Sequence, residues 1–198
     1  GVVARLTRTP FVGAISGLGP VFNQINWLHR LRLKLVLLAY KFIYSPKSAA
    51  VICQNEHDKS ILLNFRVCAE SKISIIPGSG VDLDKFKPNT SKKDKHNILM
   101  ASRMLLDKGI KEFCSAAKQF NSYGESDVKF RLAGPIDELS PTSISEEQLR
   151  SLCQDSEVEY LGNRSDLNIL LASASIFIMP SYYPEGVPKV LLEAAACG

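Results

Sequence analysis

Two glutamates near the end of the sequence, Glu185 and Glu193, lie eight positions apart on either side of Pro188. Because proline suits the first turn of a helix, we expect a helix to begin there and Glu193 to lie about 8 Å further along its axis. The free amides of that helix start, around Lys189 and Val190, would favour a phosphate group. The two carboxylates could then hold hydroxyl groups on either side of the phosphate, as the sugar and the ribose of a nucleotide sugar require. The alternative is a solvated loop glutamate and an ordinary surface glutamate.

The segment 100–109 (MASRMLLDKG) carries a basic pair, Arg103 and Lys108, directly after a predicted strand. Open α/β sheets bind ligands at the carboxyl ends of their strands, so this loop is a candidate ligand site. Arginine offers a two-pronged donor and lysine a point charge, and together they suit a diphosphate. Taken alone, two basic residues five positions apart are also common in an ordinary loop.

The elements that must position these residues alternate between short apolar runs and helical patterns, which predicts βαβ units with parallel sheets. In the second half of the chain we expect strands at 97–101, 128–133, 158–161 and 176–179 and helices at 110–120, 145–154 and 165–172. In the first half we expect strands at 11–15, 50–54 and 73–76 and helices at 26–44 and 56–67. A capping-box pattern, Ser145 to Gln148, marks one helix start. The polar stretch 88–95 is the predicted linker.

Length and composition are those of a globular protein. The chain has 198 residues, 45% hydrophobic and 22% charged, which excludes a disordered tail, a collagen-like fibre and a disulfide miniprotein. Its five cysteines form no CxxC pair and its three histidines share no cluster, so we expect no metal site and a reducing compartment. No apolar stretch approaches the roughly 20 residues of a membrane span. Because the sequence lacks an initiator Met and stops in a helical pattern, we expect it to be part of a longer protein.

The positive charge is concentrated at one end of the sequence. Residues 1–55 contain seven Lys and Arg and no Asp or Glu, whereas the whole chain carries a net charge of +4, so residues 56–198 carry −3. Such a surface favours polyanions, either nucleic acid or an anionic membrane. Within the predicted helix 26–44, apolar residues recur on one face, at Trp27, Leu31, Leu35, Leu38 and Phe42. The helix could dock on an anionic bilayer, could be a core helix with a basic solvated face, or could be both.

Three segments together carry a resemblance to a known family. PEGVPKVLLEA at 184–194, SRMLLDKG at 102–109 and IPGSGVDLDKF at 76–86 resemble the retaining GT-B glycosyltransferases of the GT4 family, which includes sucrose synthase and mannosyltransferases. The resemblance implies an α/β fold of GT-B type, with two Rossmann-like domains that have parallel sheets and are both incomplete here. Residues 1–88 would be the C-terminal part of the N-terminal, acceptor-side domain. Residues 89–198 would be the N-terminal part of the C-terminal, nucleotide-sugar-binding domain.

The resemblance also implies roles for individual residues. Arg103 and Lys108 would bind the donor diphosphate and, together with Glu185 at the transferred sugar, would form the catalytic set. Glu193 would hold the ribose. Amides of the loop and of the helix start would contact the sugar and the phosphate, at Gly186, Val187, Lys189 and Val190. A second group would flank the donor base less closely, at Gly134, Pro135 and Tyr160.

On the acceptor side, Gly17 and Gly19 lie in a segment, SGLGPVF, that resembles the GLGxxF loop of relatives that extend lipid-linked glycans. Where many relatives place a sugar-contacting histidine, this sequence has Ser16, and the segment alone is equally consistent with a tight turn. It lacks the third glycine of a dinucleotide-binding motif. Asp82 and Asp84 match the DxD pattern that holds a metal in other glycosyltransferases, but their context resembles the interdomain segment of GT-B proteins.

The function implied is transfer of a sugar from a nucleoside-diphosphate sugar, in particular a UDP-sugar, to a lipid-carrier-linked or other glycan in cell-surface polysaccharide synthesis. We expect retention of configuration, with the departing phosphate accepting the acceptor's proton, and neither a metal nor another cofactor. The predicted location is the cytoplasm, with an anionic surface at the inner face of the cytoplasmic membrane as a further partner. An alternative is a nucleotide-sugar-binding module without turnover. Nucleic acid is not an expected partner, because the sequence contains no motif that recognises it.

Overall fold

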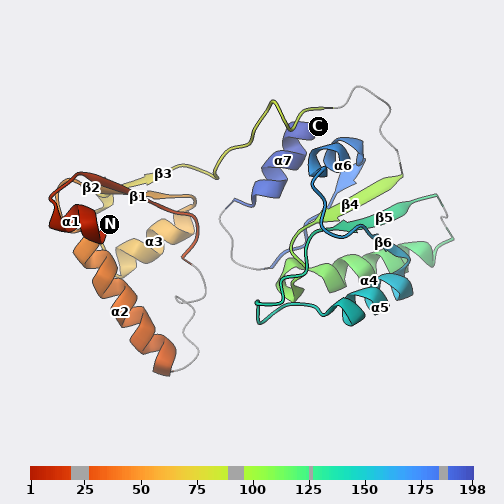
Figure 1. Ribbon diagram of the computed structural model, residues 1–198, viewed down its shortest axis with the longest axis horizontal. Helices are drawn as coiled ribbons and strands as arrows, with labels where there is room; N and C mark the ends of the chain where they lie inside the picture. Colours follow the sequence, from red (N-terminus) through yellow and green to blue (C-terminus); the bar gives the residue numbers. More distant parts are fainter. Residues whose placement is uncertain (19–26, 89–95, 125–126, 183–186) are drawn as a thin grey trace. The chain divides into compact units, whose positions relative to one another are not determined.

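The computed structural model describes residues 1–18, 27–88, 96–124, 127–182 and 187–198 (Figure 1). The chain forms two compact units, one built on Gly1–Ser79 and the other on Gly80–Tyr183 and Lys189–Gly198. Each unit has its own parallel sheet, as the alternating pattern predicted. Residues 89–95 of the predicted linker 88–95 lie outside the described ranges, as do three of the predicted site residues, Glu185, Gly186 and Gly19.

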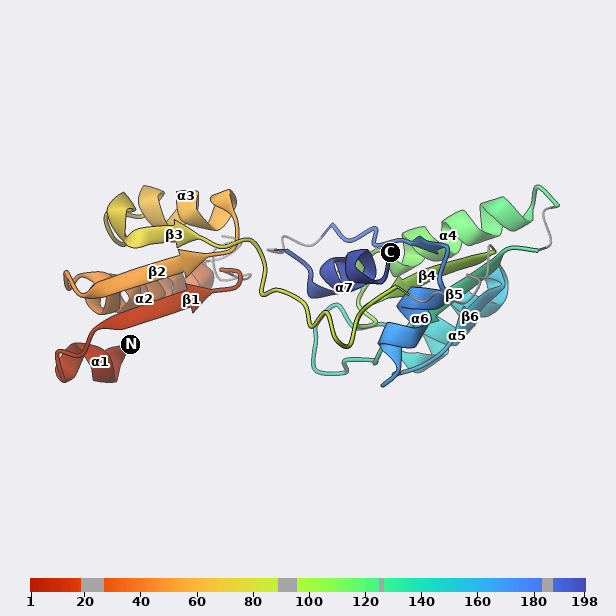
Figure 2. The same ribbon diagram turned by 90° about the horizontal axis from the view of Figure 1, so that it is seen from above.

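The first unit contains a three-stranded parallel sheet in the order β1-β2-β3. Its strands are β1 (Phe11–Ile15), β2 (Ala49–Cys53) and β3 (Ile73–Ile75), and its helices are α1 (Val2–Leu6), α2 (Trp27–Tyr44), α3 (Glu56–Asn64) and the short 3-10 helix η2 (Glu70–Lys72). Because the chain crosses the sheet in one direction, right-handed connections place α2 and α3 on the same face, as Figures 1 and 2 show. The core between them includes Ile15, Val51, Cys53, Leu62 and Val67.

The second unit contains a four-stranded parallel sheet in the order β6-β5-β4-β7. Its strands are β4 (Asn97–Ala101), β5 (Lys129–Ala133), β6 (Val158–Tyr160) and β7 (Ile176–Phe177). Its helices are η3 (Leu106–Lys108), α4 (Ile110–Asn121), α5 (Glu146–Ser156), α6 (Leu167–Ser173) and α7 (Lys189–Cys197). The chain runs outward from β4 to β6 and then returns to the other side of β4, so the strand order reverses between β4 and β7.

This reversal puts helices on both faces of the sheet. Figure 1 shows α4 and α5 on one face and α6 and α7 on the other. Two separate cores follow from it. One contains Phe113, Leu132 and Leu149 under α4 and α5, and the other contains Leu99 and Leu171 under α6 and α7. Ligands of such sheets bind outside the carboxyl ends of the strands at the point of reversal, which here lies beside the loops after β4 and β7.

Local sequence signals account for several helix boundaries. The Ser145 hydroxyl accepts a hydrogen bond from the Gln148 amide at 3.2 Å, and the Gln148 side chain accepts one from the Ser145 amide at 3.3 Å, so the predicted capping box is confirmed. The Asn55 side chain caps α3 by accepting a bond from the Asp58 amide at 2.7 Å. Helix α1 was not predicted, since it has only five residues and Gly1 provides no side-chain cap.

The division between the units falls at Ser79 and Gly80, before the boundary at residue 88 that the sequence suggested. The reason is Phe86, which is only 6% exposed and packs in the core of the second unit with Leu99 and Leu171. Residues 80–88 therefore belong by packing to the second unit.

Candidate functional site

The loop after β4 carries Arg103 and Lys108 and is fixed along its length by the segment that follows β5. The Met104 amide donates to the Pro135 carbonyl at 2.9 Å, and the Leu106 amide donates to the Thr142 carbonyl at 2.8 Å. The loop ends in η3, followed by Gly109 in the left-handed region at φ +82°. A Cβ at Gly109 would collide with the Pro180 carbonyl, so glycine is required both by the backbone angle and by this close approach.

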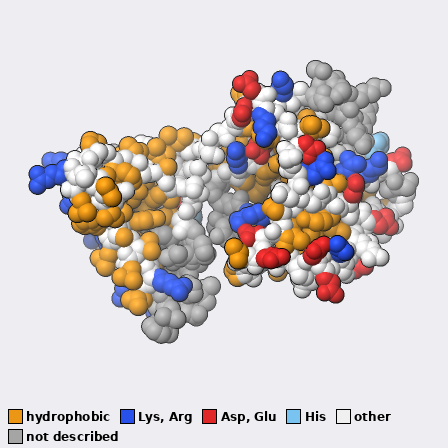
Figure 3. All heavy atoms as spheres, viewed as in Figure 1, with side chains coloured by type: hydrophobic (Ala, Val, Ile, Leu, Met, Phe, Trp, Pro, Cys, Tyr) orange, Lys and Arg blue, Asp and Glu red, His pale blue; other side chains and the backbone are white. Residues whose placement is uncertain are grey.

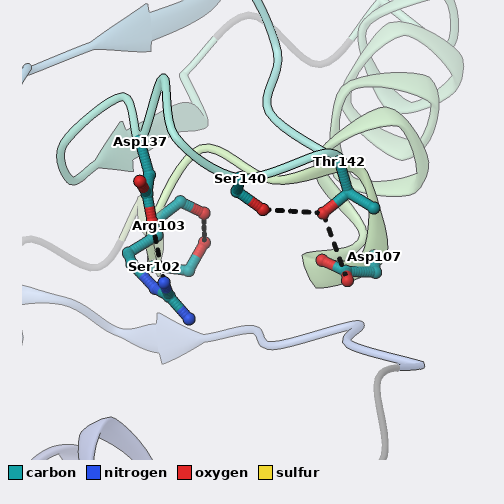
Figure 4. A network of polar contacts seen from close by, with 6 residues as sticks. All are labelled: Ser102, Arg103, Asp107, Asp137, Ser140 and Thr142. Atoms are coloured by element: carbon teal, nitrogen blue, oxygen red, sulfur yellow. Dashed lines mark hydrogen bonds and ion pairs between the residues drawn. The ribbon is translucent and has the colours of Figure 1, made fainter. Parts of the chain in front are cut away.

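The Arg103 guanidinium is held by a carboxylate from the segment after β5. Its Nη1 lies 2.8 Å from Asp137 Oδ2, and the Arg103 side chain is 57% exposed (Figure 4). An ion pair this exposed contributes about 1 kcal/mol or less to stability. Asp137 can therefore orient Arg103 without preventing it from moving to a stronger anion.

Lys108 lies in an environment that disfavours its own charge. Its pKa is lowered mainly by burial and next by the positive charge of Arg103, and the carboxylate of Asp107 partly offsets both effects. A lysine whose charge is partly desolvated beside another cation gains more from a bound anion than a fully solvated lysine would. The two cations that the sequence predicted as a pair thus act on one another in the structure.

The loop after β7 is hydrogen-bonded directly to η3. The Tyr182 amide and the Ser181 hydroxyl both donate to the Asp107 carbonyl, at 3.2 and 3.3 Å. The Tyr182 hydroxyl donates to the Leu106 carbonyl at 3.0 Å. The segment that leads toward α7 is therefore anchored on the same short helix that ends in Lys108.

Helix α7 begins at Lys189 and carries Glu193 one turn later. Glu193 is only 8% exposed, so the interpretation of it as an ordinary surface glutamate is wrong. Its Oε1 lies 3.7 Å from Lys189 Nζ, which is too long for a hydrogen bond. A buried carboxylate with so distant an ion-pair partner can accept hydrogen bonds from ligand hydroxyls. Val190 packs in the core beneath α7, and Val187 just before it is half-buried.

Gly134, Pro135 and Tyr160 join the carboxyl ends of β5 and β6 to the loop after β4. Gly134 has φ +141°, and a Cβ there would collide with the Ser102 carbonyl. Its amide donates to the Gly162 carbonyl at 2.8 Å, and its own carbonyl accepts a bond from the Tyr160 hydroxyl at 2.8 Å. Burial is the main cause that raises the pKa of Tyr160, so the hydroxyl stays protonated and can donate this bond.

Five of the predicted donor-side residues lie in segments that are hydrogen-bonded to one another at the carboxyl ends of the strands of the second sheet. They are Arg103, Lys108, Gly134, Pro135 and Tyr160. Ser181 and Tyr182, which lead toward α7, are bonded to the loop that carries Arg103 and Lys108. Gly17 belongs to the first unit, where it follows the carboxyl end of β1 and has φ +141°. The ligand roles of all these residues remain predictions.

Sequence analysis missed Asp137, Ser181 and Tyr182. Their contacts with the loop after β4 span between 34 and 76 positions in the sequence, and no local motif indicates them. In the DxD segment, Asp82 Oδ1 accepts hydrogen bonds from the amides of Asp84 and Lys85, at 3.0 and 3.2 Å. Across the described ranges, no three His, Cys, Asp or Glu are grouped as a metal site would require.

The α/β fold with parallel sheets agrees with the family that the sequence matches. Residues 82–198 match the family described as glycosyl transferases group 1, and the chain belongs to that family. The resemblance to GT4-like GT-B glycosyltransferases is thereby confirmed, as is the α/β fold with parallel sheets. The assignment of residues 1–88 and 89–198 to an acceptor-side and a donor-side domain stays a prediction.

Two curated relatives act on undecaprenol-linked glycans according to their names. The chain is 36% identical, over its whole length and 53% of the relative, to the N,N'-diacetylbacillosaminyl-diphospho-undecaprenol alpha-1,3-N-acetylgalactosaminyltransferase of Campylobacter jejuni. It is 31% identical, over 83% of its length and 46% of the relative, to the UDP-Gal:alpha-D-GlcNAc-diphosphoundecaprenol alpha-1,3-galactosyltransferase of Escherichia coli. The chain thus spans about half the length of these relatives.

Solved structures support the fold. Anabaena Alr3699/HepE in complex with UDP matches 99% of this chain with a TM-score of 0.73 at 20% identity, over 53% of that chain. TarM matches 96% of this chain with a TM-score of 0.67 at 16% identity, over 35% of that chain.

Proposed function

We propose that the full-length protein transfers a sugar from a UDP-sugar to a glycan carried on a lipid diphosphate, with retention of configuration, in cell-surface polysaccharide synthesis. The observation that carries the proposal is the contact between two loops at the point where the strand order of the second sheet reverses, between β4 and β7. There, the loop with Arg103 and Lys108 is hydrogen-bonded to the segment leading toward α7, where Glu193 is buried. The names of both curated relatives support the acceptor class, and the name of the Escherichia coli relative supports a UDP-sugar as the donor.

The chemistry follows from charge. When the bond between sugar and phosphate breaks, negative charge develops on the leaving diphosphate. Arg103, Lys108 and the free amides at the start of α7 would supply positive charge and hydrogen-bond donors to the leaving diphosphate, and electrostatic stabilisation of this kind is usually the largest single contribution to catalysis. In this proposal they perform the task that a divalent metal performs in other glycosyltransferases, so no metal is required.

Glu193 and Gly134 would orient the nucleoside. The buried Glu193 carboxylate is suited to accept hydrogen bonds from ribose hydroxyls, and Gly134 offers backbone that a base can approach closely. Glu185 would contact the transferred sugar. With retention, the acceptor hydroxyl attacks from the side that the diphosphate leaves, and the departing phosphate takes its proton, so no protein base is assigned.

A second candidate is a donor-binding module without turnover. The two possibilities differ in one result: the module binds UDP-sugar and transfers nothing.

The test uses the full-length protein and a lipid-diphosphate-linked glycan in detergent. We expect UDP-sugar-dependent transfer, lowered at least about a hundredfold by Lys108→Ala, because one group that stabilises transition-state charge is commonly worth that much. The matched control is Lys111→Ala, which replaces an exposed lysine in the first turn of α4, three residues after Lys108, and should keep full activity. Equal rates for Lys108→Ala and the wild type would refute the proposal. A product with inverted configuration would refute the retaining mechanism.

A further inference from the structure

Helix α2 has two apolar faces, and only one of them packs on the sheet of its own unit. Leu33 and Tyr44 are 3% and 6% exposed, and Leu37 and Tyr40 are packed against the core beside them. With about 100° of rotation per residue, these four positions form one stripe along the helix. This stripe accounts for the stability of α2 in the fold.

The other stripe is exposed. Leu31, Leu35, Leu38 and Phe42 are 51%, 59%, 64% and 44% exposed, and their spacing of four, three and four residues aligns them on the side of α2 roughly opposite the buried stripe. The sequence predicted this face, but it could not show that the face points away from the core. Four large apolar side chains in one exposed row indicate an interaction surface rather than scattered surface residues.

Helix α1 extends this exposed row. Val2, Val3 and Leu6 are 50%, 72% and 72% exposed, and the Arg5 guanidinium lies 5.4 Å from the centre of the Phe42 ring. We call α1 together with the exposed stripe of α2 the docking face. Figure 3 shows apolar side chains gathered over this part of the first unit, with Lys and Arg at the margins.

Among the described residues of α1 and α2, every charged side chain is positive. By helical position, Arg32 lies on one side of the stripe and Arg30, Lys34 and Lys41 lie on the other, and all four are exposed. Residues 1–55 contain no Asp or Glu to offset them. Beside the face, a cavity of about 260 Å³ at the amino ends of β1 and β2 is lined by Arg5, Arg8, Thr9 and Ser48, among others. Guanidinium and hydroxyl groups are suited to a phosphate.

We propose that the docking face binds an anionic bilayer, with the leucines and Phe42 at the level of the acyl chains and the flanking cations on lipid phosphates. Apolar side chains between long cationic ones match a membrane interface, where lysine and arginine bury their stems and keep their charges at the headgroups. The partner is a lipid surface of negative charge rather than a protein, because a band of cations without any acid matches a uniform field of phosphates. The inference rests on the proposed function only in that a lipid-linked acceptor lies in a membrane.

The experiment measures flotation of the full-length protein with vesicles that contain neither donor nor acceptor. We expect binding to phosphatidylcholine vesicles containing about one third phosphatidylglycerol, weak binding to phosphatidylcholine alone, and release as salt screens the charges. Leu35→Gln with Leu38→Gln should lower the partition coefficient about tenfold or more, because two apolar side chains leave the interface. Arg32→Gln with Lys34→Gln should lower it about fivefold for each cation removed.

The matched control is Leu139→Gln with Ile169→Gln, which removes two exposed apolar side chains of the second unit, 98% and 58% exposed. It should bind vesicles as the wild type does. All replaced residues are solvent-exposed, so thermal melting should stay within a few degrees of the wild type and verify folding. Equal partition of the wild type and the Leu35 and Leu38 variant would overturn the inference. The inference would also be overturned if light scattering showed a dimer for the wild type and a monomer for the Leu35 and Leu38 variant while both still bound vesicles. That result would assign the face to a second copy of the chain.

Failure of the docking face and failure of the proposed function are separable. Transfer to an acceptor in detergent does not need a bilayer, so the Leu35 and Leu38 variant should retain it if the two are independent. Vesicle binding without UDP-sugar transfer would refute the function and leave the docking face intact.

Discussion

At the residue scale, the environment of Lys108 leads to a prediction about pH. Burial and the charge of Arg103 lower the pKa of Lys108 in the free protein. A bound diphosphate would favour the charged amine and raise that pKa again. The affinity for UDP should therefore fall as the pH rises through the lowered pKa, and binding in that range should take up a proton.

Calorimetry in buffers of different ionisation enthalpy measures this proton uptake directly. Lys108→Ala should abolish the uptake in the alkaline range, whereas Lys111→Ala should leave it unchanged. If the affinity for UDP instead stayed constant up to the ordinary pKa of a lysine, this would contradict the link between Lys108 and the phosphate.

Asp137 leads to a second prediction at this scale. Its ion pair with Arg103, at 2.8 Å, would compete with a donor diphosphate for the same guanidinium. Asp137→Asn removes that competition, so the affinity for UDP should rise by up to about fivefold, which corresponds to the roughly 1 kcal/mol of an exposed ion pair. Titration of UDP into the variant measures the change. A tenfold loss of affinity would show instead that Asp137 is needed to position Arg103 for the ligand.

At the element scale, the edge of the second sheet depends on a close backbone crossing between the ends of β4 and β5. Gly134 combines φ +141° with a site where a Cβ would collide with the Ser102 carbonyl. Gly134→Ala should therefore lower the free energy of unfolding by about 2 kcal/mol or more, since both strain and a steric clash are introduced.

The matched control is Gly162→Ala. Gly162 also has positive φ, at +70°, but a Cβ there would meet nothing within 4 Å. This change should cost only about 1 kcal/mol, the usual penalty for a left-handed alanine. Urea unfolding of both variants gives the comparison, and an equal cost for the two would show that the crossing is not a steric constraint.

The elements also show which features a sequence encodes locally. The capping box at Ser145 fixed the start of α5, and Pro188 fixed that of α7, because these signals lie within one turn of the boundary they set. Strand ends were predicted less well: β7 has only two residues, Ile176–Phe177, where four were expected. A strand ends where its partner stops pairing, and the partner β4 is distant in the sequence.

At the scale of the whole molecule, two parallel sheets could be predicted because each βαβ unit leaves its own hydrophobic pattern. The strand order β6-β5-β4-β7 could not, since it depends on which edge of the sheet the returning chain joins. For the same reason the cationic pair could be named from the sequence, whereas the hydrogen bonds from Ser181 and Tyr182 to Asp107 and Leu106, in the loop of that pair, could not.

The exposed row on α2 belongs to this scale as well. Helix α2 has two apolar stripes, and the sequence pattern alone does not say which of them the sheet will cover. Within the described ranges, no helix is both long enough and apolar enough to cross a membrane.

The most direct test of the account compares the affinities of UDP and UMP by calorimetry in the full-length protein and two variants. If Arg103, Lys108 and the start of α7 hold one pyrophosphate while Glu193 holds the ribose, the wild type should prefer UDP by at least about tenfold, as charge-assisted contacts to one more phosphate predict. Lys108→Ala should erase most of that preference, and Glu193→Gln should weaken both ligands equally and preserve it. The same ratio in the wild type and in Lys108→Ala would contradict the account, because the lysine would then not contact the second phosphate.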